Sequence, residues 1–111
     1  MKFRIEKNIV KFRLSPDEIE LLKKNRALSD EILISDENSY KYTVQISDDS
    51  NNSSLVFSSK SVVASIPMLQ IDDWFNSNQI GIKEYIENDK GVTITLIVEE
   101  DLPRRKKPRV D

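Results

Sequence analysis

Residues 2–14 of the chain read KFRIEKNIVKFRL, and this stretch decides the fold. Apolar and charged side chains alternate with a period of two on both sides of Lys7-Asn8, a pattern typical of two strands with one buried face. A two-residue turn at Lys7-Asn8 places Ile5 opposite Val10, and the same register satisfies every apolar position. We therefore predict an opening β-hairpin whose buried face consists of Phe3, Ile5, Val10, Phe12 and Leu14.

The opposite face of this hairpin is basic and contains two directly opposed pairs of like charge, which a β-sheet normally disfavours. The pairs are Lys2 with Arg13 and Arg4 with Lys11. One interpretation is a solvated face that is neutralised by nearby acids such as Glu6, Asp30 or Glu31. The alternative is an anion site, because closely spaced Arg and Lys side chains suit phosphate and carboxylate groups.

Residues 15–18 follow the hairpin and carry the signals of a helix start. A serine can cap the helix, a proline occupies the first helical position, and a glutamate three residues after the serine can bond back to it. We expect this helix to run to about Arg26, with Ile19 and Leu22 facing inward.

Three more hairpins and a second short helix are predicted downstream. Their strands are residues 32–34 with 40–46, 55–57 with 62–64, and 80–86 with 92–98. Pro67 opens the second helix, whose single apolar stripe consists of Met68, Ile71, Trp74 and Phe75. That spacing favours core packing over an exposed docking stripe. Gly91 is expected to adopt the left-handed conformation in the last turn.

The order hairpin, helix, hairpin occurs twice, in residues 1–46 and 54–98, which indicates a duplicated unit despite almost no identity between the halves. The predicted class is α+β, in one domain over residues 1–100. About eight mostly antiparallel strands form a curved sheet or a partly closed barrel with two short helices. Residues 101–111 are expected to be a basic, disordered tail.

The 111 residues include no cysteine and no histidine, so the usual ligands of zinc, haem and iron–sulfur clusters are missing, and we expect no cofactor. The same absence removes the commonest general base at neutral pH and the best nucleophile. No apolar run is long enough to span a bilayer, and no disulfide framework is possible. These features favour a soluble, cytoplasmic protein.

Charge is unevenly distributed, because the chain has a net charge of −2 while its last eight residues contain five bases and one acid. This basic run could contact nucleic acid through Arg104, Arg105, Lys106, Lys107 and Arg109. It could equally be a solvated tail, and no aromatic residue is interleaved to stack on bases. The oxygen-rich residues 48–53 lack the glycine and terminal glutamate of a helix–loop–helix calcium loop, so we expect a plain surface loop.

The opening residues 1–5, together with residues 10–15 and Glu18-Ile19, resemble a family of short uncharacterised bacterial proteins, a domain of unknown function. Residues 66–74 and Ile80-Gly81 are similar to it as well. The resemblance covers most of residues 1–98 and implies a bacterial, cytoplasmic setting, with the tail from residue 101 outside it. It offers no catalytic motif to transfer.

The expected function is therefore a non-enzymatic binding or interaction module that recognises an anionic ligand or partner through the basic hairpin face. One alternative is an enzyme that acts on a phosphorylated small molecule, with carboxylates holding a divalent metal. Another is association with nucleic acid through the basic tail.

Overall fold

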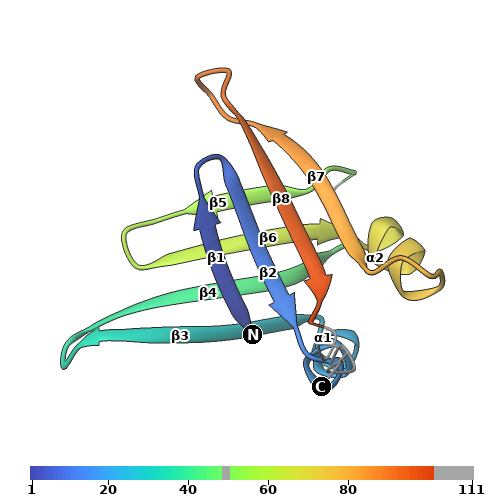
Figure 1. Cartoon of the computed structure of the whole chain (residues 1–111), viewed down its shortest axis with the longest axis horizontal. Helices are drawn as coiled ribbons and strands as arrows, with labels where there is room; N and C mark the ends of the chain where they lie inside the picture. The colour runs from blue at the N-terminus through green and yellow to red at the C-terminus, as the bar shows by residue number, and fades with distance from the viewer. Residues whose placement is uncertain (49–50, 102–111) are drawn as a thin grey trace, which may run out of the picture.

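The computed structural model describes residues 1–48 and 51–101, which form eight strands and two helices (Figure 1). This confirms the α+β class. The first half of the chain contains β1 (Lys2–Glu6), β2 (Ile9–Leu14), α1 (Pro16–Asn25), β3 (Ala27–Ser35) and β4 (Asn38–Ser47). The second half contains β5 (Ser54–Phe57), β6 (Ser61–Pro67), α2 (Met68–Phe75), β7 (Gly81–Glu87) and β8 (Thr93–Glu100).

The strands form two four-stranded sheets, and each sheet takes two strands from each half of the chain. Sheet A has the order β1-β2-β8-β7, and sheet B has the order β3-β4-β6-β5. The central pairs, β2 with β8 and β4 with β6, are parallel, and all other pairs are antiparallel. Figure 1 shows the strands of one sheet crossing those of the other, so the described residues form two stacked sheets and no closed barrel.

The opening hairpin has the predicted register. Lys7-Asn8 forms the turn, Ile5 lies opposite Val10, and Phe3 lies opposite Phe12. Of the five apolar residues predicted to be buried, Val10, Phe12 and Leu14 are buried and Phe3 is partly buried. The prediction is wrong at Ile5, which is 53% exposed. Val10 is on β2, an inner strand of sheet A, whereas Ile5 is on the edge strand β1.

The structure reveals a duplication in its strand registers. Adding 52 to the numbers of the β1–β2 pair Phe3 and Phe12 gives the β5–β6 pair Leu55 and Ala64. Adding 54 to each β3–β4 pair from Ala27–Gln45 to Leu33–Ser39 gives the β7–β8 pairs from Gly81–Glu99 to Glu87–Thr93. The same two offsets carry each parallel β2–β8 pairing onto a β6–β4 pairing. A pseudo-two-fold relation therefore exchanges sheet A and sheet B.

Backbone hydrogen bonds outside the ladders repeat in the same way. The Ile46 amide donates to the Arg26 carbonyl over 2.9 Å, and the Glu100 amide donates to the Ile80 carbonyl over 2.9 Å. Ile19 and Leu22 are the buried residues of α1, and their counterparts 52 positions later, Ile71 and Trp74, are those of α2. The two units match in geometry with little shared sequence.

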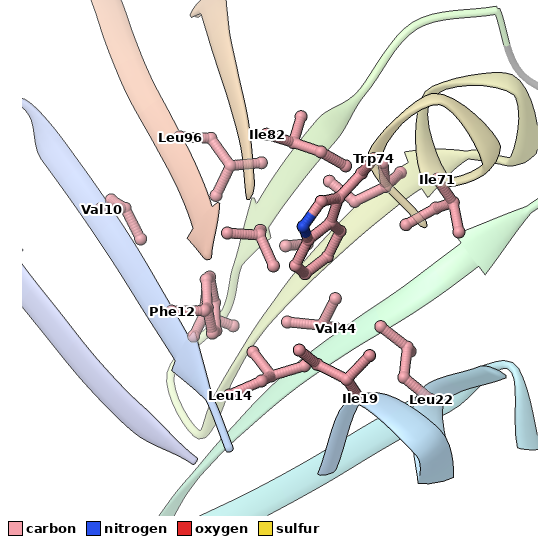
Figure 2. Packing of buried hydrophobic residues seen from close by; sticks show 14 residues of the cluster. Val10, Phe12, Leu14, Ile19, Leu22, Val44, Ile71, Trp74, Ile82 and Leu96 are labelled. Atoms are coloured by element: carbon pink, nitrogen blue, oxygen red, sulfur yellow. The ribbon is translucent and has the colours of Figure 1, made fainter. Parts of the chain in front are cut away.

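The core fills the space between the crossing sheets and the two helices (Figure 2). Figure 2 shows Trp74 reaching from α2 toward side chains of both sheets, which confirms core packing for this helical stripe. The fully covered aliphatic and aromatic side chains come from both halves and include Phe12, Leu14, Leu22, Val44, Val62, Ile66, Leu96 and Val98.

The first helix begins as the sequence predicts. The Ser15 hydroxyl accepts a hydrogen bond from the Glu18 amide over 3.2 Å, and the Glu18 carboxylate accepts one from the Ser15 amide over 2.9 Å. Arg26 ends the helix with a left-handed φ of 63°. The second helix has no such box, because Pro67 is both the last residue of β6 and the cap of α2.

Candidate functional site

Within residues 1–48 and 51–101, no layer packs on the outer face of sheet A. In Figure 1 sheet A lies in front of sheet B, and neither helix covers the side turned to the viewer. The side chains on this side alternate along each strand with those of the core. The four bases singled out from the sequence, Lys2, Arg4, Lys11 and Arg13, lie on this side, which we call the basic face.

Three bases of the basic face lie in one row across all four strands of the sheet. Arg4 is opposite Lys11, and Lys11 is opposite Ile97 of β8. Ile97 is in turn opposite Lys83 of β7. Because neighbouring strands are about 4.8 Å apart, the row spans about 14 Å between the backbones of Arg4 and Lys83.

The next row along the strands is uncharged at its three positions on β2, β8 and β7. It consists of Ile9 of β2, Thr95 of β8 and Tyr85 of β7, after Glu6 of β1. Tyr85 is 68% exposed, and the Lys83 ammonium lies 5.7 Å from the centroid of its ring. The face thus combines an exposed aromatic side chain with a row of cations.

The end of the basic face near Lys2 and Arg13 is neutralised by acids at the end of β8. Lys2 lies 2.9 Å from Asp101, and Arg13 lies 3.0 Å from Glu99. Glu99 is also 3.8 Å from Lys11. The hydrogen bond from Lys2, with the positive charges of Lys2 and Arg13, lowers the pKa of the Asp101 carboxyl below its usual value.

Only some of the acids that the sequence suggested pair with the bases of this face. Glu6 pairs with Arg4 at 3.2 Å, as expected, and both side chains are exposed. Asp30 lies instead 3.4 Å from the Met1 ammonium. Glu99, Asp101, Lys83 and Tyr85 were missed, because only the parallel pairing of β2 with β8 brings them to the hairpin.

Two clefts lie between α2 and β7, and one of them also includes the segment before β5. Their volumes are about 290 and 280 Å³, and Gln70 and Glu84 line both. The Ser53 hydroxyl lies 3.0 Å from the Gln70 side-chain oxygen and 3.2 Å from a Glu84 carboxylate oxygen. In residues 1–48 and 51–101 no three Asp or Glu side chains come together as a metal site, so the structure adds no observation for the metal-assisted enzyme.

A third cleft of about 220 Å³ lies between the two helices. Lys23 of α1 and Phe75 of α2 line it, together with Glu20 and Glu100. The Glu20 carboxylate lies 3.2 Å from the Lys23 ammonium, so these two charges neutralise each other.

Several predicted features cannot be placed. The bases Arg104, Arg105, Lys106, Lys107 and Arg109 lie outside the described residues, as do residues 49 and 50 of the polar loop. In the described part of the chain, neither helix has the length and apolar character needed to cross a membrane.

Comparison with known proteins gives a family. Neither the curated proteins nor the solved structures include a significant match to this chain. The model of a family of unknown function, DUF7009, matches residues 1–107. The match extends past residue 101, so the resemblance does not stop before the tail as the sequence suggested. Because almost the whole chain is matched, the protein belongs to this family of unknown function.

Proposed function

We propose that the protein is a non-enzymatic binding module that holds an extended anionic group of a partner on the basic face. The observation that carries this proposal is the row formed by Arg4, Lys11 and Lys83 across the uncovered side of sheet A. A row of cations about 14 Å long suits a chain of phosphate or carboxylate groups better than a single small ion.

The cations of this row are available to bind an anionic ligand, because their ion pairs within the described residues are weak or missing. Among the described residues, Arg4 is paired only with the exposed Glu6. Exposed pairs of this kind contribute about 0–1 kcal/mol, so exchange of Glu6 for a ligand costs little. Lys83 forms no ion pair with any residue that the structure describes. Lys11 has its nearest carboxylate, Glu99, at 3.8 Å, and Arg13 shares that carboxylate.

Lys2 and Arg13 have a different role in this proposal. Their contacts with Asp101 and Glu99 join the edge of β1 and β2 to the end of β8. We therefore assign ligand binding to the Arg4, Lys11 and Lys83 end of the basic face. The chain as a whole has a net charge of −2, so a bound anion is attracted locally rather than by the total charge.

The test is thermal unfolding in inorganic tripolyphosphate and in chloride at matched ionic strength. A ligand that binds only the folded state adds about 2.7 kcal/mol at a hundredfold excess over its Kd. For a domain of this size that is a rise in Tm of roughly 10–20 °C. The variant Arg4→Gln/Lys83→Gln should lose most of this gain.

The matched control is Lys24→Gln/Lys60→Gln, which removes the same charge from exposed positions on α1 and in the β5–β6 turn. It should keep the gain in tripolyphosphate. A chain without residues 103–111 should keep it too, because the tail is not part of the proposed site. Equal shifts for all variants in both salts would refute the proposal, since only screening would then be acting.

A further inference from the structure

The β3–β4 hairpin extends beyond the rest of sheet B. Strand β6 pairs with β4 only from Lys41 onward, so the hairpin residues before Lys41 have only each other as ladder partners. Figure 1 shows this part of β3 and β4 projecting past the β5–β6 turn. We call residues 31–41 the arm.

The arm exposes three consecutive large aliphatic side chains. Ile32, Leu33 and Ile34 are 57%, 75% and 66% exposed, respectively. Such an apolar run on a two-stranded ribbon is unusual, because ribbons of this kind are at best marginally stable in water. An apolar surface of this kind marks an interaction site.

Charge indicates which surface the arm fits. Glu31 is opposite Lys41, while Asp36 and Glu37 at the tip have no base opposite them in the ladder. The arm is therefore apolar and acidic. Antiparallel pairing of two arms about Leu33 would place Asp30 of one opposite Asp36 of the other, and such like-charge pairs are disfavoured.

The complementary surface is on the same chain. The basic face presents Arg4, Lys11 and Lys83 beside the exposed apolar parts of Ile9 and Tyr85. It lies on the side of sheet A turned away from sheet B, whereas the arm extends from sheet B, so the two cannot meet within one molecule.

We infer that the arm of one copy docks on the basic face of a second copy of this chain. The inference rests on the proposed function, because it identifies the acidic tip of the arm as the anionic group that the basic face holds. Aliphatic side chains on one face of the arm cover Ile9 and Tyr85, and the tip acids pair with the row of cations. Contact of this kind is salt-sensitive, since the charges lie at an exposed rim.

The test is sedimentation velocity of the full chain over a range of concentrations in low and high salt. We expect the wild type to associate reversibly at low salt and to dissociate at high salt. The arm variant Leu33→Ser/Ile34→Ser and the face variant Arg4→Gln/Lys83→Gln should each be monomeric. Far-UV circular dichroism and urea unfolding establish that both variants are folded.

The decisive measurement is an equimolar mixture of the two variants. The arm variant keeps an intact basic face and the face variant keeps an intact arm, so one complete contact can form and association should return. Non-specific clustering of apolar side chains would not show this complementation. A mixture that stays monomeric, or a wild type that is monomeric at every concentration, overturns the inference. The partner of the arm would then be a different protein.

The two proposals can fail separately. If tripolyphosphate stabilises the wild type while no self-association occurs, the basic face binds anions and only the second-copy partner is wrong. The arm variant should retain its stabilisation by tripolyphosphate in full, because its two substitutions lie outside the basic face.

Discussion

The Lys23 ammonium lies 4.7 Å from the centroid of the Phe75 ring. These residues are 52 positions apart, the offset that relates the buried residues of α1 to those of α2, so they occupy equivalent positions in the two halves. The two halves of the chain are thus in contact through equivalent positions, a lysine ammonium from one half and a phenylalanine ring from the other. Phe75 also packs on Trp74, with ring centroids 4.9 Å apart.

This contact predicts a measurable coupling between the two residues. In a double-mutant cycle of Lys23→Met and Phe75→Leu, the coupling energy should be about 0.5–1 kcal/mol, the usual range for an exposed cation–π pair. Urea unfolding of the four proteins gives the value. A cycle of Lys24→Met with Phe75→Leu is the control, because Lys24 points elsewhere on α1, and its coupling should be close to zero.

A second prediction concerns Glu18, which joins the helix cap to the chain start. Its carboxylate accepts from the Ser15 amide and forms an ion pair with the Met1 ammonium. Partial burial raises the pKa of Glu18, but the bonds from Met1 and Ser15 outweigh it and hold the pKa below its ordinary value of 4.5. The contribution of Glu18 to the free energy of unfolding is therefore fully present above about pH 4.5. It is lost as the pH falls through the lowered pKa.

Glu18→Gln should cost about 1–2 kcal/mol at pH 7, because glutamine can still cap the helix but carries no charge for the Met1 ammonium. The difference in unfolding free energy between wild type and variant should shrink below about pH 4.5. Urea unfolding between pH 7 and pH 3 measures it. A difference that stays constant over this range would show that the ion pair contributes nothing.

Substitution of either glycine should lower the free energy of unfolding, but for different physical reasons. A Cβ at Gly81 would lie 2.3 Å from the Val98 carbonyl oxygen and 2.6 Å from Cα of Glu99, so neighbouring backbone must move. Gly91 has open space but a φ of +75°. We expect Gly81→Ala to cost about 2–3 kcal/mol by overpacking and Gly91→Ala about 1 kcal/mol by backbone strain.

Gly91→Asn separates these causes, because asparagine tolerates the left-handed region better than alanine does. It should be more stable than Gly91→Ala in urea unfolding, whereas Gly81→Asn should be no better than Gly81→Ala. Similar values for alanine and asparagine at position 91 would argue against strain there.

Local structure could be predicted from the sequence because it is determined by residues that are close together in the chain. The alternation around Lys7-Asn8 determines the register of the first hairpin, and Ser15 with Glu18 determines the start of α1. Gly91 adopts the left-handed conformation that its turn requires. Each of these features depends on residues a few positions apart, so propensity and spacing are sufficient.

The assembly of the hairpins was not readable, because it depends on contacts between distant residues. The parallel pairing of β2 with β8 joins Arg13 to Glu99, and no local pattern indicates this partnership. Lys83 and Tyr85 were missed on the basic face for the same reason. The exposure of Ile5 accompanies the edge position of β1 in the sheet, which alternation along one strand does not encode.

The last prediction concerns the two halves of the chain as separate fragments, residues 1–48 and 51–111. Each sheet takes two strands from each half, so either fragment alone lacks half of both sheets and exposes its core side chains. We expect each fragment alone to be largely unfolded by far-UV circular dichroism. An equimolar mixture should regain the spectrum of the intact protein.

The duplication raises a competing outcome, which is that a fragment pairs with itself through the same pseudo-two-fold relation. The core opposes this, because Phe12 corresponds to Ala64 and Leu22 corresponds to Trp74. A first-half homodimer would contain two phenylalanines where the native core has one phenylalanine and one alanine, and a second-half homodimer would contain two tryptophans. Because cores are packed near crystal density, both self-pairings suffer overpacking or cavities that the native pair avoids. Sedimentation of the separate and mixed fragments should therefore show a folded one-to-one complex, and a folded homodimer of either fragment would contradict this account of the core.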